Sequence, residues 1–180
     1  GVHVIGAVVA VDHGYCLAGG GGHQVDFLVD LRKGLFKHHH GENGGTGGHI
    51  YPAVAVAEAL KRKYGEEVEI LFVGAEGKME MEKIPALGYN IVGLPIAGLQ
   101  RRLEPKNLLV PWKMVRSVMK AREIIRDFSA DAVVGFGGYA SAPVLWAAQR
   151  MGVPTIIQEQ NSYAGVTNKL LARGARRICV

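Results

Sequence analysis

From residue 44 onward, the hydrophobic and polar positions of the chain alternate between two periods. Apolar residues recur at helical spacing in some segments, and short apolar runs of β-strand character lie between these segments. We predict helices over residues 52–64, 80–87, 107–128, 143–151 and 166–173, and strands over residues 68–73, 89–94, 131–135, 155–158 and 177–180. Repeated alternation of strand and helix predicts an α/β fold, a Rossmann-like parallel sheet with helices on both faces.

Residues 1–43 follow a different pattern from residues 44–180. Residues 2–11 and 25–31 are candidate strands, but a run of four glycines separates them and three consecutive histidines, His38, His39 and His40, follow. Because neighbouring side chains cannot all face one ion from a regular element, we assign no metal to these histidines. We expect residues 1–43 to be foreign to the fold or poorly ordered, and residues 44–180 to form one domain.

Composition and charge indicate which kinds of ligand or macromolecule the protein can bind. The hydrophobic content of 48% is enough for one folded domain, and the net charge of +5 suits anionic partners without choosing among them. Aromatic residues make up 7% of the chain and are not interleaved with basic residues, which argues against nucleic acid. Cys16 and Cys179 have no metal-binding or CxxC spacing, so we expect free thiols in a reducing compartment. No apolar run approaches the roughly 18 residues of a membrane-spanning helix.

The most informative stretch is residues 44–52, Gly-Gly-Thr-Gly-Gly-His-Ile-Tyr-Pro. Glycines let backbone N–H groups approach a bound group closely, and a helix that begins after the loop adds its positive dipole end. We predict phosphate as the ligand and His49 as a residue that can accept a proton from a substrate bound there. The alternative is a tight strand-to-helix turn that carries a surface histidine. The loop does not fit the GxGxxG dinucleotide fingerprint, and the chain has no GK[ST] motif of a P-loop.

Two further loops follow predicted strands and belong at the same sheet edge, where α/β proteins bind ligands. Residues 135–143 are again rich in glycine after a predicted strand, and we expect Pro143 to begin the next helix. Residues 158–161 read Gln-Glu-Gln-Asn. Amides can hold hydroxyl groups, and a carboxylate can orient a base. The alternatives are a simple turn for the former, and a helix cap formed by Glu159 and Asn161 for the latter.

The three loops, in this order, resemble the MurG family of peptidoglycan N-acetylglucosaminyltransferases. The resemblance lies in Gly-Gly-Thr-Gly-Gly-His with Tyr-Pro at residues 44–52, Gly-Phe-Gly-Gly-Tyr at 135–139, and Glu-Gln-Asn at 159–161 followed by Ala-Gly-Val-Thr-Asn-Lys at 164–169. It implies the N-terminal, acceptor-side half of a GT-B glycosyltransferase. Such an enzyme transfers N-acetylglucosamine from UDP-N-acetylglucosamine to lipid I, giving lipid II. It works with inversion and needs no cofactor or metal. A role in peptidoglycan synthesis also implies roles in cell shape and cell division.

The resemblance also implies roles for individual residues. His49 matches the proposed base, and Glu159 is the next candidate for catalysis. The donor- and phosphate-binding positions are Thr46, Gly47, Gly48 and Asn161. Positions of the second glycine loop and the acceptor side are Gly137, Gly138, Tyr139 and Asn168.

The chain departs from the family pattern at both ends. Residues 37–43 occupy the place where the family has a strand running directly into the glycine loop, and the chain stops at Val180, so we expect the C-terminal donor domain to be absent. We therefore expect the isolated chain to be inactive. The alternatives are a non-catalytic module that binds a lipid-linked or phosphorylated sugar, and another GT-B enzyme for UDP-sugars, such as a 2-epimerase.

A last expectation concerns membranes. Apolar residues recur at helical spacing near the start of the long predicted helix, and cations surround them: Leu108, Leu109, Trp112 and Val115, with Arg101 and Arg102. Such a patch would bind anionic lipid head groups. The alternative is ordinary core with a solvated charged face. The resemblance favours the membrane interpretation, and it implies a peripheral protein on the cytoplasmic face of the bacterial plasma membrane.

Overall fold

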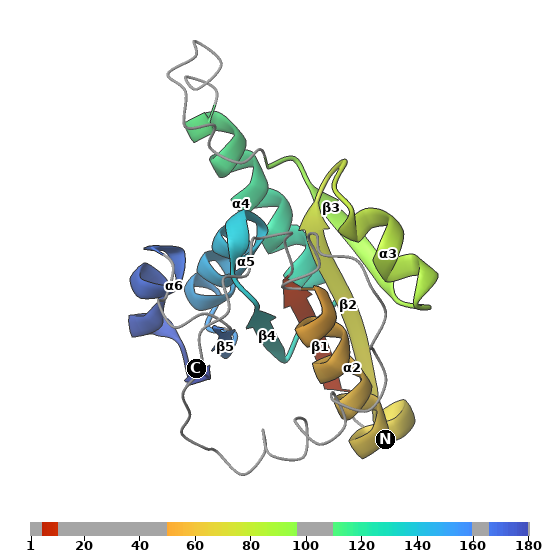
Figure 1. Cartoon of the computed structure of the whole chain (residues 1–180). Helices are drawn as coiled ribbons and strands as arrows, with labels where there is room; N and C mark the ends of the chain where they lie inside the picture. The colour runs from red at the N-terminus through yellow and green to blue at the C-terminus, as the bar shows by residue number, and fades with distance from the viewer. Residues whose placement is uncertain (1–4, 11–49, 97–109, 160–165, 180) are drawn as a thin grey trace.

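A computed structural model describes residues 5–10, 50–96, 110–159 and 166–179 (Figure 1). Strands and helices alternate along these residues, as the hydrophobic pattern predicts. The strands are β1 (Ile5–Ala10), β2 (Val68–Ala75), β3 (Asn90–Leu94), β4 (Ala132–Gly135), β5 (Thr155–Gln158) and β6 (Arg177–Cys179). The helices are α2 (Ile50–Tyr64), α3 (Glu80–Ala86), α4 (Val110–Asp127), α5 (Gly138–Arg150) and α6 (Val166–Leu171), with short 3-10 turns at Gly65–Glu67 and Ala172–Gly174.

The strands form one sheet in the order β3-β2-β1-β4-β5-β6, and every neighbouring pair is parallel. This is the order of a doubly wound Rossmann fold. The direction of winding reverses between β1 and β4, because β1 leads outward to β2 whereas β4 leads outward to β5. The predicted fold class is therefore confirmed, and the switch point where such folds bind ligands lies between β1 and β4.

Strand β1 is the central strand, which corrects the expectation for part of residues 1–43. It pairs with β2 on one side and β4 on the other, and Val8, Val9 and Ala10 have no exposed surface. The backbone N–H of Gly6 donates to Asp131 Oδ2 at 2.8 Å, which fixes the start of the strand to the residue before β4. For residues 5–10, the prediction of a segment foreign to the fold is wrong. These residues form an apolar run, and a central strand that is buried on both faces of a parallel sheet requires such a run. Residues 11–43, including the second candidate strand, lie outside the described part.

Helices cover both faces of the sheet, as predicted (Figure 1). On one face, Val8 and Ala10 pack with residues of α4, α5 and α6, and on the other Ala7 and Val9 pack with residues of α2 and α3. Neighbouring residues of β1 thus enter opposite cores, as the alternation of side chains along a strand requires.

Helix α5 begins earlier than the sequence pattern predicts. The prediction places its start at Pro143, but the helix begins at Gly138 and Pro143 lies inside it. Gly137 has φ 88° and ψ −174°, a conformation open in practice only to glycine, so the chain turns directly from β4 into the helix. The proline therefore marks the early part of the helix rather than its first residue.

Candidate functional site

The candidate site lies at the carboxyl edge of the sheet, where β1, β4 and β5 end at Ala10, Gly135 and Gln158. Helix α5 begins at this edge directly after β4, and α2 begins at Ile50, inside the glycine-rich stretch 44–52 and two residues before its predicted start. The first N–H groups of a helix lack intrahelical partners and carry a positive partial charge. Helices α2 and α5, of 15 and 13 residues, thus place their positive N-terminal ends near the switch point between β1 and β4, where they can bind phosphate.

The second glycine loop is a tight turn that is hydrogen-bonded to the end of β1. Gly137 and Gly138 both have positive φ, 88° and 80°. The N–H of Phe136 donates to the carbonyl of Ala10 at 3.1 Å. The buried Ser141 hydroxyl lies 2.5 Å from the Gly137 carbonyl oxygen and 3.1 Å from that of Ala10, so its proton links the first turn of α5 to the end of β1. Sequence reasoning did not single out Ser141, although its place in the Gly-Gly-Tyr-Ala-Ser run at the helix start is a usable signal.

The third loop brings together two residues that the sequence named separately. Glu159 follows β5 and Asn168 lies in α6, and both are buried. Asn168 Nδ2 donates to Glu159 Oε2 at 2.9 Å, and the Glu159 N–H donates to the Cys179 carbonyl at 2.8 Å. Burial raises the pKa of the adjacent Cys179 thiol, so a reactive thiolate is disfavoured there.

The remaining predicted site residues stay predictions. Outside the described part lie His49, Thr46, Gly47, Gly48 and Asn161. For Tyr139, only the backbone is described, and it lies in the first turn of α5. Among the described residues, no group of three His, Cys, Asp or Glu side chains has the arrangement of a metal site.

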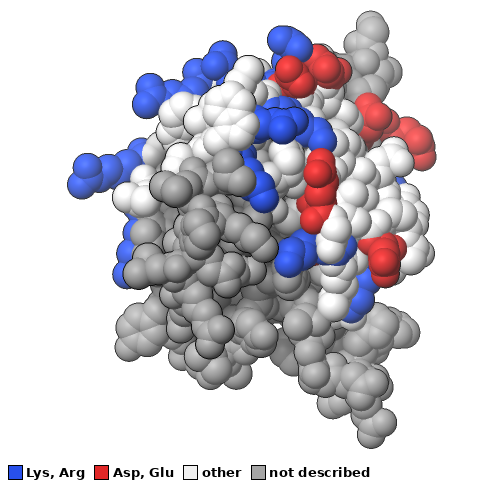
Figure 2. All heavy atoms as spheres, turned by 90° about the horizontal axis from the view of Figure 1, so that it is seen from above, with Lys and Arg blue, Asp and Glu red and all other residues white. Residues whose placement is uncertain are grey.

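The exposed face of α4 carries large apolar side chains. Trp112, Val115 and Met119 are 63%, 51% and 60% exposed, and their spacing of three and four residues places them on one stripe. Trp112 and Val115 are thus not core, and Met119 extends the stripe that the sequence predicted. Lys113 and Arg116 beside them are exposed, whereas Leu108, Leu109, Arg101 and Arg102 lie outside the described residues. In the view from above, several Lys and Arg side chains project beside uncharged surface along one margin of the molecule (Figure 2). No helix in the described segments is long and apolar enough to cross a membrane.

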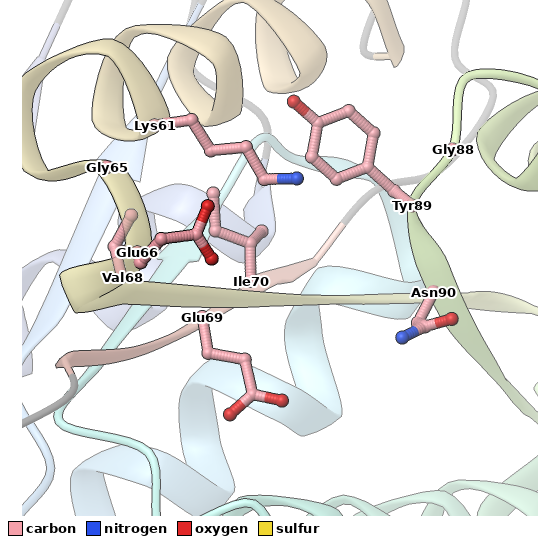
Figure 3. Close-up of a pocket in the computed structure, with 9 residues that line it drawn as sticks. All are labelled: Lys61, Gly65, Glu66, Val68, Glu69, Ile70, Gly88, Tyr89 and Asn90. Atoms are coloured by element: carbon pink, nitrogen blue, oxygen red, sulfur yellow. The ribbon is translucent and has the colours of Figure 1, made fainter.

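A hollow of about 270 Å³ lies away from the candidate site (Figure 3). It is lined by the end of α2, the 3-10 turn and the first residues of β2 and β3: Lys61, Gly65, Glu66, Val68, Glu69, Ile70, Gly88, Tyr89 and Asn90. The Lys61 ammonium lies 4.5 Å from the centre of the Tyr89 ring, and burial, with a smaller effect of Glu58, raises the pKa of that tyrosine. Because all strands are parallel, these strand starts lie at the amino edge of the sheet, opposite Gly135 and Gln158. We therefore place the candidate chemistry at the carboxyl edge.

Curated relatives share extensive sequence identity with this chain. Each of two of them is called a UDP-N-acetylglucosamine--N-acetylmuramyl-(pentapeptide) pyrophosphoryl-undecaprenol N-acetylglucosamine transferase. The protein of Porphyromonas gingivalis (strain ATCC 33277) is 61% identical over 137 residues, and that of Bacteroides fragilis (strain ATCC 25285) is 62% identical over 137 residues. In both cases the match covers 76% of this chain but only 36% of the relative. The chain thus spans little more than a third of the length of these relatives.

Solved structures show the same fold. The crystal structure of Acinetobacter baumannii MurG matches 97% of this chain and 41% of its own, with a TM-score of 0.68 and 26% identity. UDP-GlcNAc 2-epimerase from Neisseria meningitidis matches with a TM-score of 0.52 at 10% identity, covering 96% of this chain and 39% of its own, which shows a shared fold alone.

The family match is continuous over the part of the chain that builds the candidate site, apart from β1. Residues 43–180 match the glycosyltransferase family 28 N-terminal domain. This range begins one residue before the glycine loop and includes the second glycine loop, Glu159 and Asn168. The chain therefore belongs to the glycosyltransferase family 28 N-terminal domain family.

Proposed function

We propose that this chain is the acceptor-side half of an enzyme that transfers N-acetylglucosamine from UDP-N-acetylglucosamine to lipid I, undecaprenyl-pyrophosphoryl-MurNAc-pentapeptide, giving lipid II. One observation carries the proposal: the identity of 61% over 137 residues with a transferase whose name states this donor group and acceptor. The part of the relatives that this chain does not match supplies the donor half in this proposal. The substrates of the chain are then a nucleotide-sugar and a lipid-linked sugar.

The reaction is an inverting displacement. A sugar hydroxyl of the acceptor attacks the anomeric carbon of the donor, the new C–O bond forms as the bond to the diphosphate breaks, and the electron pair leaves with UDP. His49 takes the proton of the attacking hydroxyl. Backbone amides at Thr46, Gly47 and Gly48, with the N-termini of α2 and α5 at the same edge, stabilise the charge of the diphosphate.

The other site residues act in binding and orientation. Asn161 contacts the donor, and Gly137, Gly138 and Tyr139 form the wall of the cleft that faces the acceptor. The positive φ of both glycines lets the backbone of this wall approach a ligand without interference from a Cβ atom. Glu159 and Asn168, joined by a hydrogen bond, lie at the same edge of the sheet, beside the end of β5.

The acceptor carries a long lipid, so the proposal includes a peripheral location on an anionic membrane, the cytoplasmic face of the bacterial plasma membrane. The exposed stripe of Trp112, Val115 and Met119 is the observation in favour. Apolar side chains ringed by cations enter the interface between head groups and acyl chains, while Lys and Arg attract anionic lipids.

A second candidate function is a module that binds a lipid-linked or phosphorylated sugar and transfers nothing. The observation in its favour is that the described features of the site, the positive φ of Gly137 and Gly138 and the N-termini of α2 and α5, are suited to binding an anionic group. Turnover separates the two candidates.

The test is transfer of labelled N-acetylglucosamine from its UDP donor to a lipid I analogue. The 180-residue chain is compared with the same chain extended by the C-terminal remainder of the Bacteroides fragilis relative. We expect turnover only by the extended chain, because both substrates must be held in one cleft for reaction. Robust turnover by the short chain overturns the half-enzyme proposal, and no turnover by the extended chain favours the binding module.

Two variants of the extended chain test the roles of site residues. His49→Ala is expected to lower kcat by roughly 10²–10⁴-fold, the usual contribution of a general base. Asn161→Ala is expected to raise KM for the donor as well as lower kcat, because it removes a binding contact. Lys61→Ala, at the amino edge, is the matched control and should leave both constants unchanged. Full activity of His49→Ala removes this histidine from the mechanism.

A further inference from the structure

Glu159 is held in place from two sides. Its N–H donates to the carbonyl of Cys179 in β6, and its Oε2 accepts a hydrogen bond of 2.9 Å from Asn168 Nδ2 in α6. The two residues are 6% and 5% exposed, so little water reaches either partner. A hydrogen bond is stronger away from water, and a buried acceptor that loses its donor costs more than an exposed one. The Glu159 carboxylate therefore has one strongly preferred position.

The orientation of the Asn168 amide follows from the same contact. If its oxygen faced Glu159 Oε2, two acceptors would meet at 2.9 Å, so the nitrogen must face the carboxylate. Asn168 Oδ1 is buried and accepts no hydrogen bond from the described residues. Among the described residues, the Asn168 side chain therefore makes its hydrogen bond through Nδ2, to Glu159.

We propose that Asn168 is a positioning residue that acts through Glu159, and that the buried pair holds a carboxylate at the carboxyl edge of β5 in one orientation. The proposal rests on the proposed transfer function and assigns Glu159 the task of orienting groups at that edge. A carboxylate that is 6% exposed and bound to an amide is poorly placed to exchange protons with a substrate. This separates Glu159 from His49, which remains the proposed base.

Exchanging the two chemical groups tests the pair. Asn168→Asp breaks the bond because it removes the donor and places two carboxyl groups against each other, whereas Glu159→Gln keeps an acceptor oxygen for Asn168 Nδ2. The double variant restores one N–H to oxygen bond with the carboxylate moved to position 168. In the 180-residue chain, we expect Asn168→Asp to lower the thermal midpoint by about 3–10 °C, Glu159→Gln to lower it less, and the double variant to recover most of the loss caused by Asn168→Asp. A double variant with no recovery overturns the pairing.

Activity in the extended chain distinguishes a positioned carboxylate from a purely structural link. We expect Asn168→Ala to lower kcat by about 10²-fold, the cost of misplacing a group by about 1 Å, with KM for the donor changed less than about threefold. The double variant should stay impaired in kcat although its stability has recovered, because the carboxylate is no longer at position 159. Recovery of kcat together with stability, or an unchanged kcat in Asn168→Ala, overturns the proposal.

The matched control is Gln149→Ala. Gln149 Nε2 donates to the carbonyl of Leu171 at 2.9 Å and to Thr155 Oγ1 at 3.2 Å, so it also ties α6 to its neighbours but lies in no proposed site. We expect a lower thermal midpoint and a kcat within about twofold of the parent chain. If the extended parent chain transfers no sugar, the proposed function fails, while the thermal midpoints still support or overturn the pairing.

Discussion

Gly137 is the residue on which the geometry of the second glycine loop depends. Its φ of 88° and ψ of −174° turn the chain from β4 into α5, and the Ser141 hydroxyl then bonds to its carbonyl and to that of Ala10. A side chain at this position would clash with the backbone in that conformation. One residue thus links the end of the central strand to the start of a helix that points its positive end at the site.

Gly137→Ala is expected to lower the free energy of unfolding by roughly 1–3 kcal/mol, the cost of backbone strain at a position that only glycine tolerates. Gly152→Ala is the control, because Gly152 has a left-handed φ of 75° with open space around its Cβ position and lies away from the site. Urea denaturation measures both variants. A loss for Gly137→Ala no greater than that for Gly152→Ala would contradict the special role of the turn.

At the scale of elements, the sequence predicted most helices and strands because their side-chain periods are clear. The helices and strands predicted over residues 52–180 differ from those of the structure mainly in their first and last residues. Helix α5, for example, begins at Gly138, directly after Gly137, and not at Pro143. The sequence marks residues 2–11 as a candidate strand but predicts that residues 1–43 are foreign to the fold, whereas residues 5–10 form the central strand β1. The reason is physical: a short apolar run becomes a central strand only through pairing with β2 and β4, which local sequence does not reveal.

Val8→Ala tests whether β1 belongs to the core. Val8 has no exposed surface and packs against the face covered by α4, α5 and α6, so loss of its methyl groups should cost roughly 1.5–3 kcal/mol of unfolding free energy. Val115→Ala, on the exposed stripe of α4, should change it by less than about 0.5 kcal/mol. Equal effects of the two variants in chemical denaturation would show that β1 does not form part of the core.

Helix α4 carries the prediction about membranes. Replacing Trp112 and Met119 by serine removes two large exposed apolar side chains, and burial of each in lipid is worth about 1.5 kcal/mol or more. We expect the partition coefficient onto anionic vesicles to fall at least about tenfold, measured by sedimentation, with the circular dichroism spectrum unchanged. Trp146→Ser, on α5, is the control. Unchanged binding by the double variant would remove the stripe from the proposal.

At the scale of the whole molecule, the parallel sheet separates two edges with different chemistry. The carboxyl edge joins the ends of β1, β4 and β5 to the starts of α2 and α5, and it holds the pair Glu159 and Asn168. The sequence named Glu159 and the second glycine loop because strand-to-helix loops meet at this edge, and it named Asn168 only through the family resemblance. Their mutual hydrogen bond, and the link through Ser141, depend on side-chain packing across separate elements and could not be predicted.

The most direct test of this account is hydrogen exchange of the 180-residue chain with and without a soluble lipid I analogue. If the carboxyl edge binds the acceptor, amides of residues 135–141 and of Glu159 should exchange more slowly with the analogue present. Amides of Gly65–Glu67 and residues 88–90, around the hollow at the amino edge, should not change. Protection confined to the amino edge, or none at either edge at saturating analogue, would contradict the placement of the site.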